Sequence, residues 1–141
     1  MKREHKFELI EHTADIGVIG YGGSKAEAFE NAAFGMFSIM ADLDKYEPTD
    51  IIEVVATGDD DIALLERFLS SLIVLFDGDG LMPLDFKMID LSAGKLVCMV
   101  SYRKIADDIE WLGPSIKAVT YHRMSVERSE GTWCAQAIFD V

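Results

Sequence analysis

The segment from residue 62 to residue 76 constrains the fold most strongly, because its apolar residues cover more than half of the circumference of a helix. A helix with so little polar surface must be covered by other elements, so we expect it to be the more buried of two helices. Three aspartates at 59–61 precede it, where carboxylates favour the positive end of a helix. Residues 77–80 end it, with glycine available for a left-handed cap.

A first helix is expected to begin at Ser24. This serine lies three residues before Glu27, the capping-box spacing in which the serine oxygen accepts a hydrogen bond from a free backbone N–H. Apolar residues follow at helical spacing through about residue 41, and the alanines among them would let the helix lie close to a sheet. The Met and Phe side chains of this stripe could form a partner groove, but we expect them to fill the core.

Runs rich in β-branched and aromatic residues surround the two helices and predict strands. They span residues 7–10, 16–21, 51–57, 84–91, 95–105, 116–127 and 132–141, with hairpin-length connections at 92–94 and 129–131. This order predicts an α+β fold in which two helices pack on a largely antiparallel sheet. A length of 141 residues with 50% hydrophobic side chains indicates one domain, residues 1–141.

The balance of charge argues against direct binding of nucleic acid. The chain has 25 Asp and Glu against 13 Lys and Arg, a net charge of −12, which repels a phosphate backbone. The same charge suits a metal cation or a basic protein partner.

The location of the protein is expected to be cytoplasmic, without a membrane segment. No apolar run reaches the roughly 18 residues that a membrane span needs, and the charged N-terminus has no apolar signal segment behind it. Cys98 and Cys134 lie in apolar, strand-like runs, so reduced buried thiols are favoured over a disulfide or a zinc site.

Few residues could carry catalysis. No serine or cysteine lies in a nucleophile elbow, and the imidazole bases are limited to His5, His12 and His122. The acidic segments 42–50 and 77–80 lack the frame of a calcium-binding EF-hand loop, and the glycine-rich turn at 20–23 lacks the lysine of a phosphate loop.

A short polar segment at residues 11–17 separates two apolar runs and contains Asp15. Asp140 and the α-carboxylate of Val141 cluster oxygen atoms at the other end of the sequence. Together with Asp15 they would make a hard-oxygen site suited to calcium or magnesium, although spacing alone does not bring them together.

Four segments together resemble the archease family, and the resemblance runs essentially from end to end. They are residues 11–17 (Glu-His-Thr-Ala-Asp-Ile-Gly), the helix segment 27–37, residues 116–122 (Ile-Lys-Ala-Val-Thr-Tyr-His) and residues 139–141 (Phe-Asp-Val). The resemblance implies an α+β fold with a strand-helix-strand-strand module. It also implies an accessory protein, itself no enzyme, that activates the tRNA-splicing RNA ligase by promoting guanylylation and repeated turnover of that ligase.

By the same resemblance, calcium or a similar divalent ion would bind Asp15, Asp140 and Val141, and Lys117 would lie near this acidic pocket and matter for activation. Arg123 departs from the pattern, because many relatives have an acidic or amide residue there. This departure puts in doubt a metal-binding role at that edge, but not the carboxylate group.

Two alternatives from other functional classes remain at this point. One is a chaperone-like binding module that uses the Met and Phe surface. The other is a small metal-dependent hydrolase with His12 or His122 as base and with Asp15 and Asp140 as metal ligands.

Overall fold

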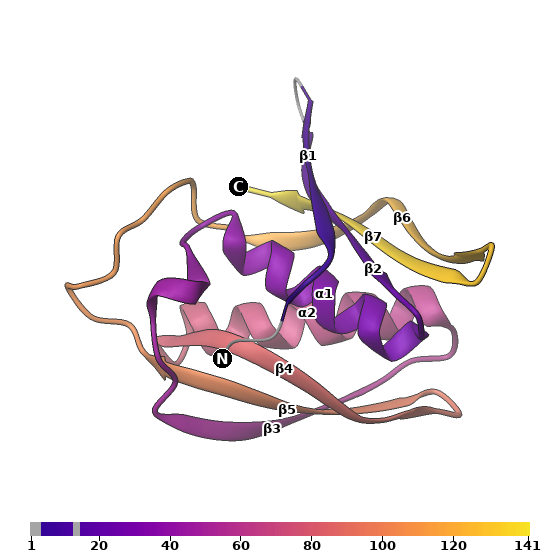
Figure 1. Cartoon of the computed structure of the whole chain (residues 1–141), viewed down its shortest axis with the longest axis horizontal. Helices are drawn as coiled ribbons and strands as arrows, with labels where there is room; N and C mark the ends of the chain where they lie inside the picture. Colours follow the sequence, from indigo (N-terminus) through magenta and orange to yellow (C-terminus); the bar gives the residue numbers. More distant parts are fainter. Residues whose placement is uncertain (1–3, 13–14) are drawn as a thin grey trace.

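The computed structural model describes residues 4–12 and 15–141, without the side chain of His12 (Figure 1). Two α-helices and seven strands form in the described chain, as the sequence patterns predict. They are β1 (Phe7–His12), β2 (Asp15–Gly22), α1 (Lys25–Ser38), β3 (Asp50–Thr57), α2 (Asp61–Asp77), β4 (Leu81–Ser92), β5 (Lys95–Lys104), β6 (Ala118–Ser129) and β7 (Thr132–Asp140).

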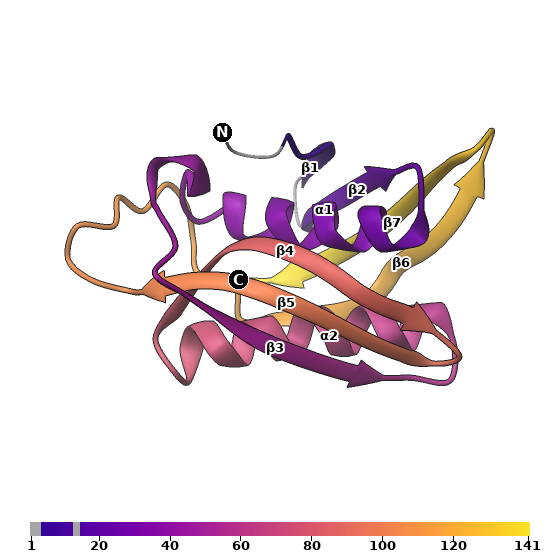
Figure 2. The ribbon, with the colours of Figure 1, turned by 60° about the horizontal axis from the view of Figure 1, so that its bottom comes forward.

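The strands form two sheets, and both helices lie between them (Figures 1 and 2). One sheet has the order β1-β2-β7-β6, the other has the order β3-β5-β4, and every strand pair in the described chain is antiparallel. The α+β fold is confirmed, although the strands divide between two sheets instead of forming one. The division arises because β2, from the start of the chain, pairs with β7 from its end.

Each sheet is built from the same order of elements. β3, α2, β4 and β5 form a strand-helix-strand-strand unit whose sheet order is β3-β5-β4. β2, α1, β6 and β7 repeat this order with the sheet arrangement β2-β7-β6, and the first unit is inserted between α1 and β6. The strands β2 and β7 of the outer unit therefore become neighbours although most of the chain separates them.

The helix α1 is the more buried of the two, so the expectation that the 62–76 helix would be was wrong. Every residue of α1 from 28 to 37 is buried, because the helix contacts β2 and β7 on one side and β4 on the other. The helix α2 buries one face and leaves Val74 62% exposed. In α1, Met36 and Phe37 are fully buried and fill the core, as expected.

The position of α1 depends on its cap and on glycines in β2. The hydroxyl of Ser24 accepts a hydrogen bond from the backbone N–H of Glu27, which fixes the start of the helix as predicted. A Cβ atom at Gly20 would lie 2.3 Å from the carbonyl oxygen of Ala28 and 2.3 Å from the nitrogen of Ala32. The helix backbone therefore approaches the strand more closely than any side chain on β2 would allow.

Two hairpin connections close as predicted. Ala93 and Gly94 both have positive φ angles, 49° and 75°, and so do Glu130 and Gly131, at 53° and 81°. Consecutive positive angles are typical of the tight turns that match the twist of antiparallel strands.

Among the described residues, no helix is long and apolar enough to cross a membrane. Cys98 is buried and Cys134 is half-buried, and both are free thiols.

We predict that Gly20→Ala destabilises the fold by about 1–3 kcal/mol, because the added methyl group clashes with the backbone of α1. Thermal or urea unfolding followed by circular dichroism measures the change. Gly23→Ala is the matched control, since no heavy atom lies within 4 Å of the added Cβ. Equal stability of the two variants would contradict the close packing of α1 on β2.

Candidate functional site

The two aspartates of the predicted cation site lie opposite one another on the central strands of the four-stranded sheet, where β2 begins and β7 ends. We call this end of the sheet the edge. Asp15 opens β2 and Asp140 ends β7. Ile16 pairs with Phe139, so in an antiparallel register the next pair of positions is Asp15 and Asp140. Opposed residues of an antiparallel pair place their side chains on the same face, so both carboxylates lie on the face turned away from α1.

Lys117 lies beside this edge. Its backbone N–H donates a 2.8 Å hydrogen bond to the carbonyl oxygen of Asp140, and the next residue, Ala118, pairs with Asp140 in the sheet. Lys117 and Val141 are both exposed. The sequence regions 15, 117 and 140–141 thus meet at one place, although no single motif contains them.

A bulge in β6 faces the same edge. Thr120 pairs with Ile138 and Ser125 pairs with Gln136, so residues 121–124 of β6 oppose only one residue of β7. Arg123 has a φ of +56°, the left-handed region that a residue with a branched or long side chain seldom adopts. The side-chain amide of Gln136 donates a 2.7 Å hydrogen bond to the carbonyl oxygen of Arg123 and holds this conformation.

The bulge directs Arg123 to Asp15. The guanidinium Nη1 lies 3.1 Å from the Oδ2 atom of Asp15, with the two side chains 47% and 27% exposed. An exposed ion pair of this kind contributes at most about 1 kcal/mol to stability, so its main effect is on the charge of the site. From the sequence we expected Arg123 to leave the carboxylates of the predicted site unaffected. In the structure, Arg123 contacts one of them, Asp15.

The donor set fits a hard cation in the chemistry of its oxygen atoms. Asp15 and Asp140 offer carboxylate oxygens from neighbouring strands on one face, the ligand type that calcium and magnesium prefer. In residues 4–12 and 15–141, however, no three His, Cys, Asp or Glu side chains lie close enough to hold a metal ion. The two aspartate side chains are therefore an incomplete ligand set by themselves, and Arg123 already contacts one oxygen of Asp15.

Among the described side chains, no histidine is placed beside Asp15 and Asp140 as a general base would be. His122 is exposed within the bulge, where its backbone N–H donates to the Thr120 hydroxyl at 3.1 Å. The His12 side chain and Thr13 lie outside the described residues. His5 is elsewhere, between α1 and β4, with Nδ1 3.0 Å from Asn31 Oδ1.

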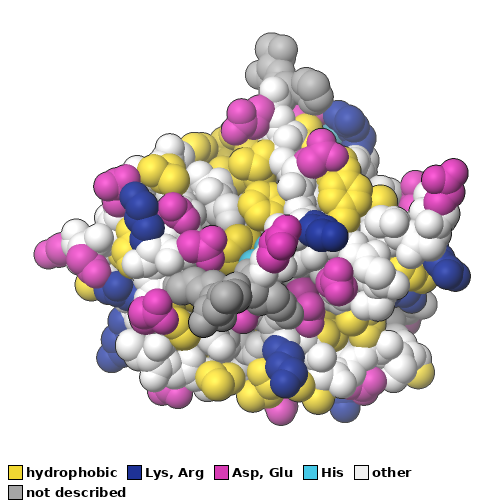
Figure 3. Space-filling model, viewed as in Figure 1, with side chains coloured by type: hydrophobic (Ala, Val, Ile, Leu, Met, Phe, Trp, Pro, Cys, Tyr) yellow, Lys and Arg dark blue, Asp and Glu magenta, His cyan; other side chains and the backbone are white. Residues whose placement is uncertain are grey.

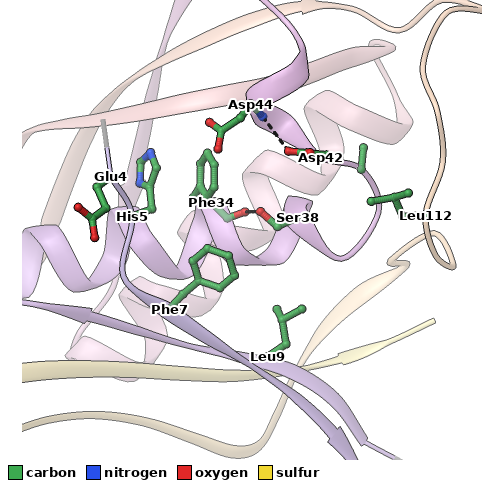
Figure 4. Close-up of a pocket in the computed structure, with 10 residues that line it drawn as sticks. Glu4, His5, Phe7, Leu9, Phe34, Ser38, Asp42, Asp44 and Leu112 are labelled. Atoms are coloured by element: carbon green, nitrogen blue, oxygen red, sulfur yellow. Dashed lines mark hydrogen bonds between the residues drawn. The ribbon is translucent and has the colours of Figure 1, made fainter. Parts of the chain in front are cut away.

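A second feature, which the sequence did not predict, is a hollow of about 450 Å³ between β1 and the end of α1 (Figure 4). We call it the β1 groove. Figure 3 shows apolar side chains gathered on this face of the molecule, with carboxylates and a few Lys or Arg side chains around them. No periodic pattern could have found the groove, because its residues come from the N-terminal segment, α1, the following turn and the loop after β5. Its lining residues are Glu4, His5, Phe7, Leu9, Phe34, Ser38, Ala41, Asp42, Asp44 and Leu112.

Comparison with known proteins identifies the family. Residues 7–141 match the archease protein family (MTH1598/TM1083). The protein archease of Sulfolobus acidocaldarius is 37% identical over 137 residues, which are 96% of this chain and 99% of that protein.

Two solved structures have the same fold. The solution structure of Methanobacterium thermoautotrophicum protein 1598 superposes with a TM-score of 0.78 at 32% identity and covers 96% of this chain and 98% of its own. The crystal structure of a Thermotoga maritima archease, described as a "possible chaperone", has a TM-score of 0.63 at 23% identity, with 99% and 100% of the chains covered. The chain therefore belongs to the archease family.

Proposed function

We propose that this protein is an accessory activator of the tRNA-splicing RNA ligase, that it promotes guanylylation and repeated turnover of the ligase, and that it is not itself an enzyme. The observation that carries the proposal is the meeting of Asp15, Lys117 and Asp140 at one end of the sheet, since the family resemblance assigns the two aspartates to cation binding and Lys117 to activation. The net charge of −12 supports a basic protein partner over direct contact with RNA.

Asp15, Asp140 and the terminal residue Val141 would hold a calcium ion or another divalent cation. A bound cation supplies positive charge and Lewis acidity at this edge. The chain's own residues do the positioning: the sheet register aligns the two aspartates, and the backbone N–H of Lys117 fixes the carbonyl of Asp140. The exposed Lys117 ammonium adds a positive charge that a carboxylate or phosphate of the ligase complex would contact.

Arg123 competes with such a cation for Asp15. Its guanidinium already contacts one carboxylate oxygen, and its positive charge repels a second cation at short range. Cation binding then requires Arg123 to leave Asp15 or to share it. The exposure of the arginine side chain, 47%, leaves room for this movement.

The ligase proposal is tested by mixing this protein with a tRNA-splicing RNA ligase, GTP and a divalent metal ion. We expect more guanylylated ligase and several turnovers per ligase molecule, and we expect Asp15→Ala and Lys117→Ala to lose most of this gain. Asp107→Ala, which removes an exposed carboxylate from the loop after β5, is the control that should keep it. No gain from the unmodified protein would sink the proposal.

Calcium affinity tests the cation site separately. Asp15→Ala and Asp140→Ala should each weaken calcium binding at least about tenfold, or 1.4 kcal/mol, because each removes a charged oxygen ligand. Isothermal titration calorimetry measures the affinity, with Asp107→Ala as the control. Unchanged affinity in both variants would refute the site.

Arg123→Gln should strengthen calcium binding about tenfold, since it removes the competing charge and keeps a side chain of similar length. The same calorimetric titration measures this effect. Arg128→Gln removes the same charge from an exposed position of β6 and should change the affinity by less than about twofold. If both arginine variants gave the same affinity as the unmodified protein, Arg123 would not compete with the cation.

The two alternatives give different results in simple assays. The description of the Thermotoga maritima relative as a possible chaperone supports testing suppression of aggregation of unrelated client proteins without the ligase. A hydrolase would turn over phosphoesters alone and would lose that activity in Asp15→Ala. Either outcome, in the absence of ligase activation, would replace the proposed function.

A further inference from the structure

The β1 groove exposes apolar side chains that come from distant parts of the chain. Leu9 of β1 is 40% exposed and Leu112 of the loop after β5 is 58% exposed, and both line the same hollow (Figure 4). Phe7 and Phe34 form its floor, with ring centroids 5.9 Å apart. Single exposed leucines are ordinary on a protein surface, but leucines gathered around an aromatic floor form a contiguous patch of the kind that binds a partner.

His5 holds the aromatic floor in place. Its ring stacks on Phe34 with centroids 3.7 Å apart and an interplanar angle of 11°. Its Nδ1 lies 3.0 Å from Oδ1 of Asn31 in α1, and its Nε2 lies 3.4 Å from Oδ1 of Asp85 in β4. The His5 side chain is only 4% exposed. A partner side chain that enters the groove therefore meets a wall that is already ordered, which lowers the entropy cost of binding.

The loop that carries Leu112 is also fixed. The backbone N–H of Leu112 donates a 2.8 Å hydrogen bond to the carbonyl oxygen of Met40, which follows α1. Arg103 binds Asp108 through two hydrogen bonds of 2.8 and 2.6 Å, and this guanidinium holds the pKa of Asp108 below its usual range. The clamp is therefore formed at neutral pH, and Leu112 stays at the rim of the groove.

The rim of the groove is acidic. Glu4, Asp42 and Asp44 line it, and the described lining residues include no Lys or Arg. Asp42 accepts a hydrogen bond from the backbone N–H of Asp44 at 3.2 Å and is exposed, so it keeps free acceptor positions. An apolar floor inside a carboxylate rim is complementary to an apolar side chain flanked by basic ones, and it repels a nucleic-acid backbone.

We propose that the β1 groove binds an extended segment of a protein partner in which Leu or Phe side chains are flanked by Lys or Arg. The apolar side chains contact Phe7, Phe34 and Leu112, and the basic side chains pair with the carboxylates of the rim. An extended segment fits because β1 is an edge strand of its sheet and, in the part of the chain that the structure describes, pairs with β2 alone. This inference does not depend on the ligase proposal or on a bound cation.

The probe is a fluorescein-labelled peptide with the sequence Gly-Lys-Leu-Lys-Phe-Lys-Leu-Lys-Gly, and its twin has Glu in place of every Lys. Fluorescence anisotropy at low salt should show that the basic peptide binds at least about tenfold more tightly than the acidic twin. Leu112→Ser and Asp44→Lys should each weaken binding of the basic peptide at least about fivefold.

Two control variants make the same changes elsewhere. Val74→Ser removes an exposed apolar side chain from α2, and Glu53→Lys reverses an exposed charge on β3. Both should bind within about twofold of the unmodified protein. Amide chemical shifts of the unmodified protein, recorded with the basic peptide, should change at Leu9, Phe34 and Leu112, and this mapping needs no variant to fold.

Several results would overturn the proposal. One is a dissociation constant of the basic peptide above 1 mM, a binding free energy weaker than about −4 kcal/mol. Another is equal affinity for the basic and the acidic peptide. Equal losses of affinity in the control variants, or chemical-shift changes confined to another face, would overturn it as well. A labelled nine-nucleotide uridine oligomer whose binding was weakened by Leu112→Ser and strengthened by Asp44→Lys would assign the groove to RNA instead.

Discussion

The close approach of α1 to β2 is the constraint on which the rest of the structure depends. At Gly20 and Gly22 no side chain stands between the strand and the helix, so the helix backbone at Ala28 rests directly on the sheet there. With the second sheet on the other side, this approach leaves residues 28–37 of α1 buried between the two sheets. It also fixes the position of β2, and with it the position of Asp15 relative to the end of β7. The packing of Gly20 against the helix thus helps to hold Asp15, at the far end of the same strand, in place.

The nested arrangement of the two strand-helix-strand-strand units explains why the candidate site uses both ends of the sequence. The inner unit, β3 to β5, occupies the middle of the chain and forms its own sheet. The outer unit must then pair β2 with β7 and β6 across that insertion. Residues 15, 117 and 140 meet at one edge because this pairing is antiparallel and in a fixed register.

The helices, the strands and their caps could be predicted because each is determined by local chemistry. Ser24 and Glu27 fix a helix start through a hydrogen bond three residues apart, and alternation or turn residues mark the strands. The relative burial of the helices could not be predicted. The number of large apolar side chains favours α2 as the more buried helix, whereas the small residues of α1 allow a sheet to pack on each of two sides.

The candidate site could be assigned only through family resemblance. Nothing in the spacing of Asp15 and Asp140 indicates that they are neighbours, because the register of strands joined by a long insertion is a tertiary property. The contact of Arg123 with Asp15 was beyond sequence reasoning for a further reason: a four-residue bulge and a positive φ angle direct the side chain across the sheet.

The acidic edge and the β1 groove differ in how their negative charge is balanced. At the edge, Arg123 pairs with Asp15 and Lys117 lies next to Asp140 in the sheet, so two basic residues partly offset the two aspartates and the α-carboxylate of Val141. At the groove, the three rim carboxylates have no Lys or Arg beside them among the described lining residues. Because Coulomb attraction falls with distance and with salt, a basic segment is drawn to the surface with local excess negative charge. Of the two surfaces, the groove is therefore the one at which a basic segment meets the less compensated negative charge.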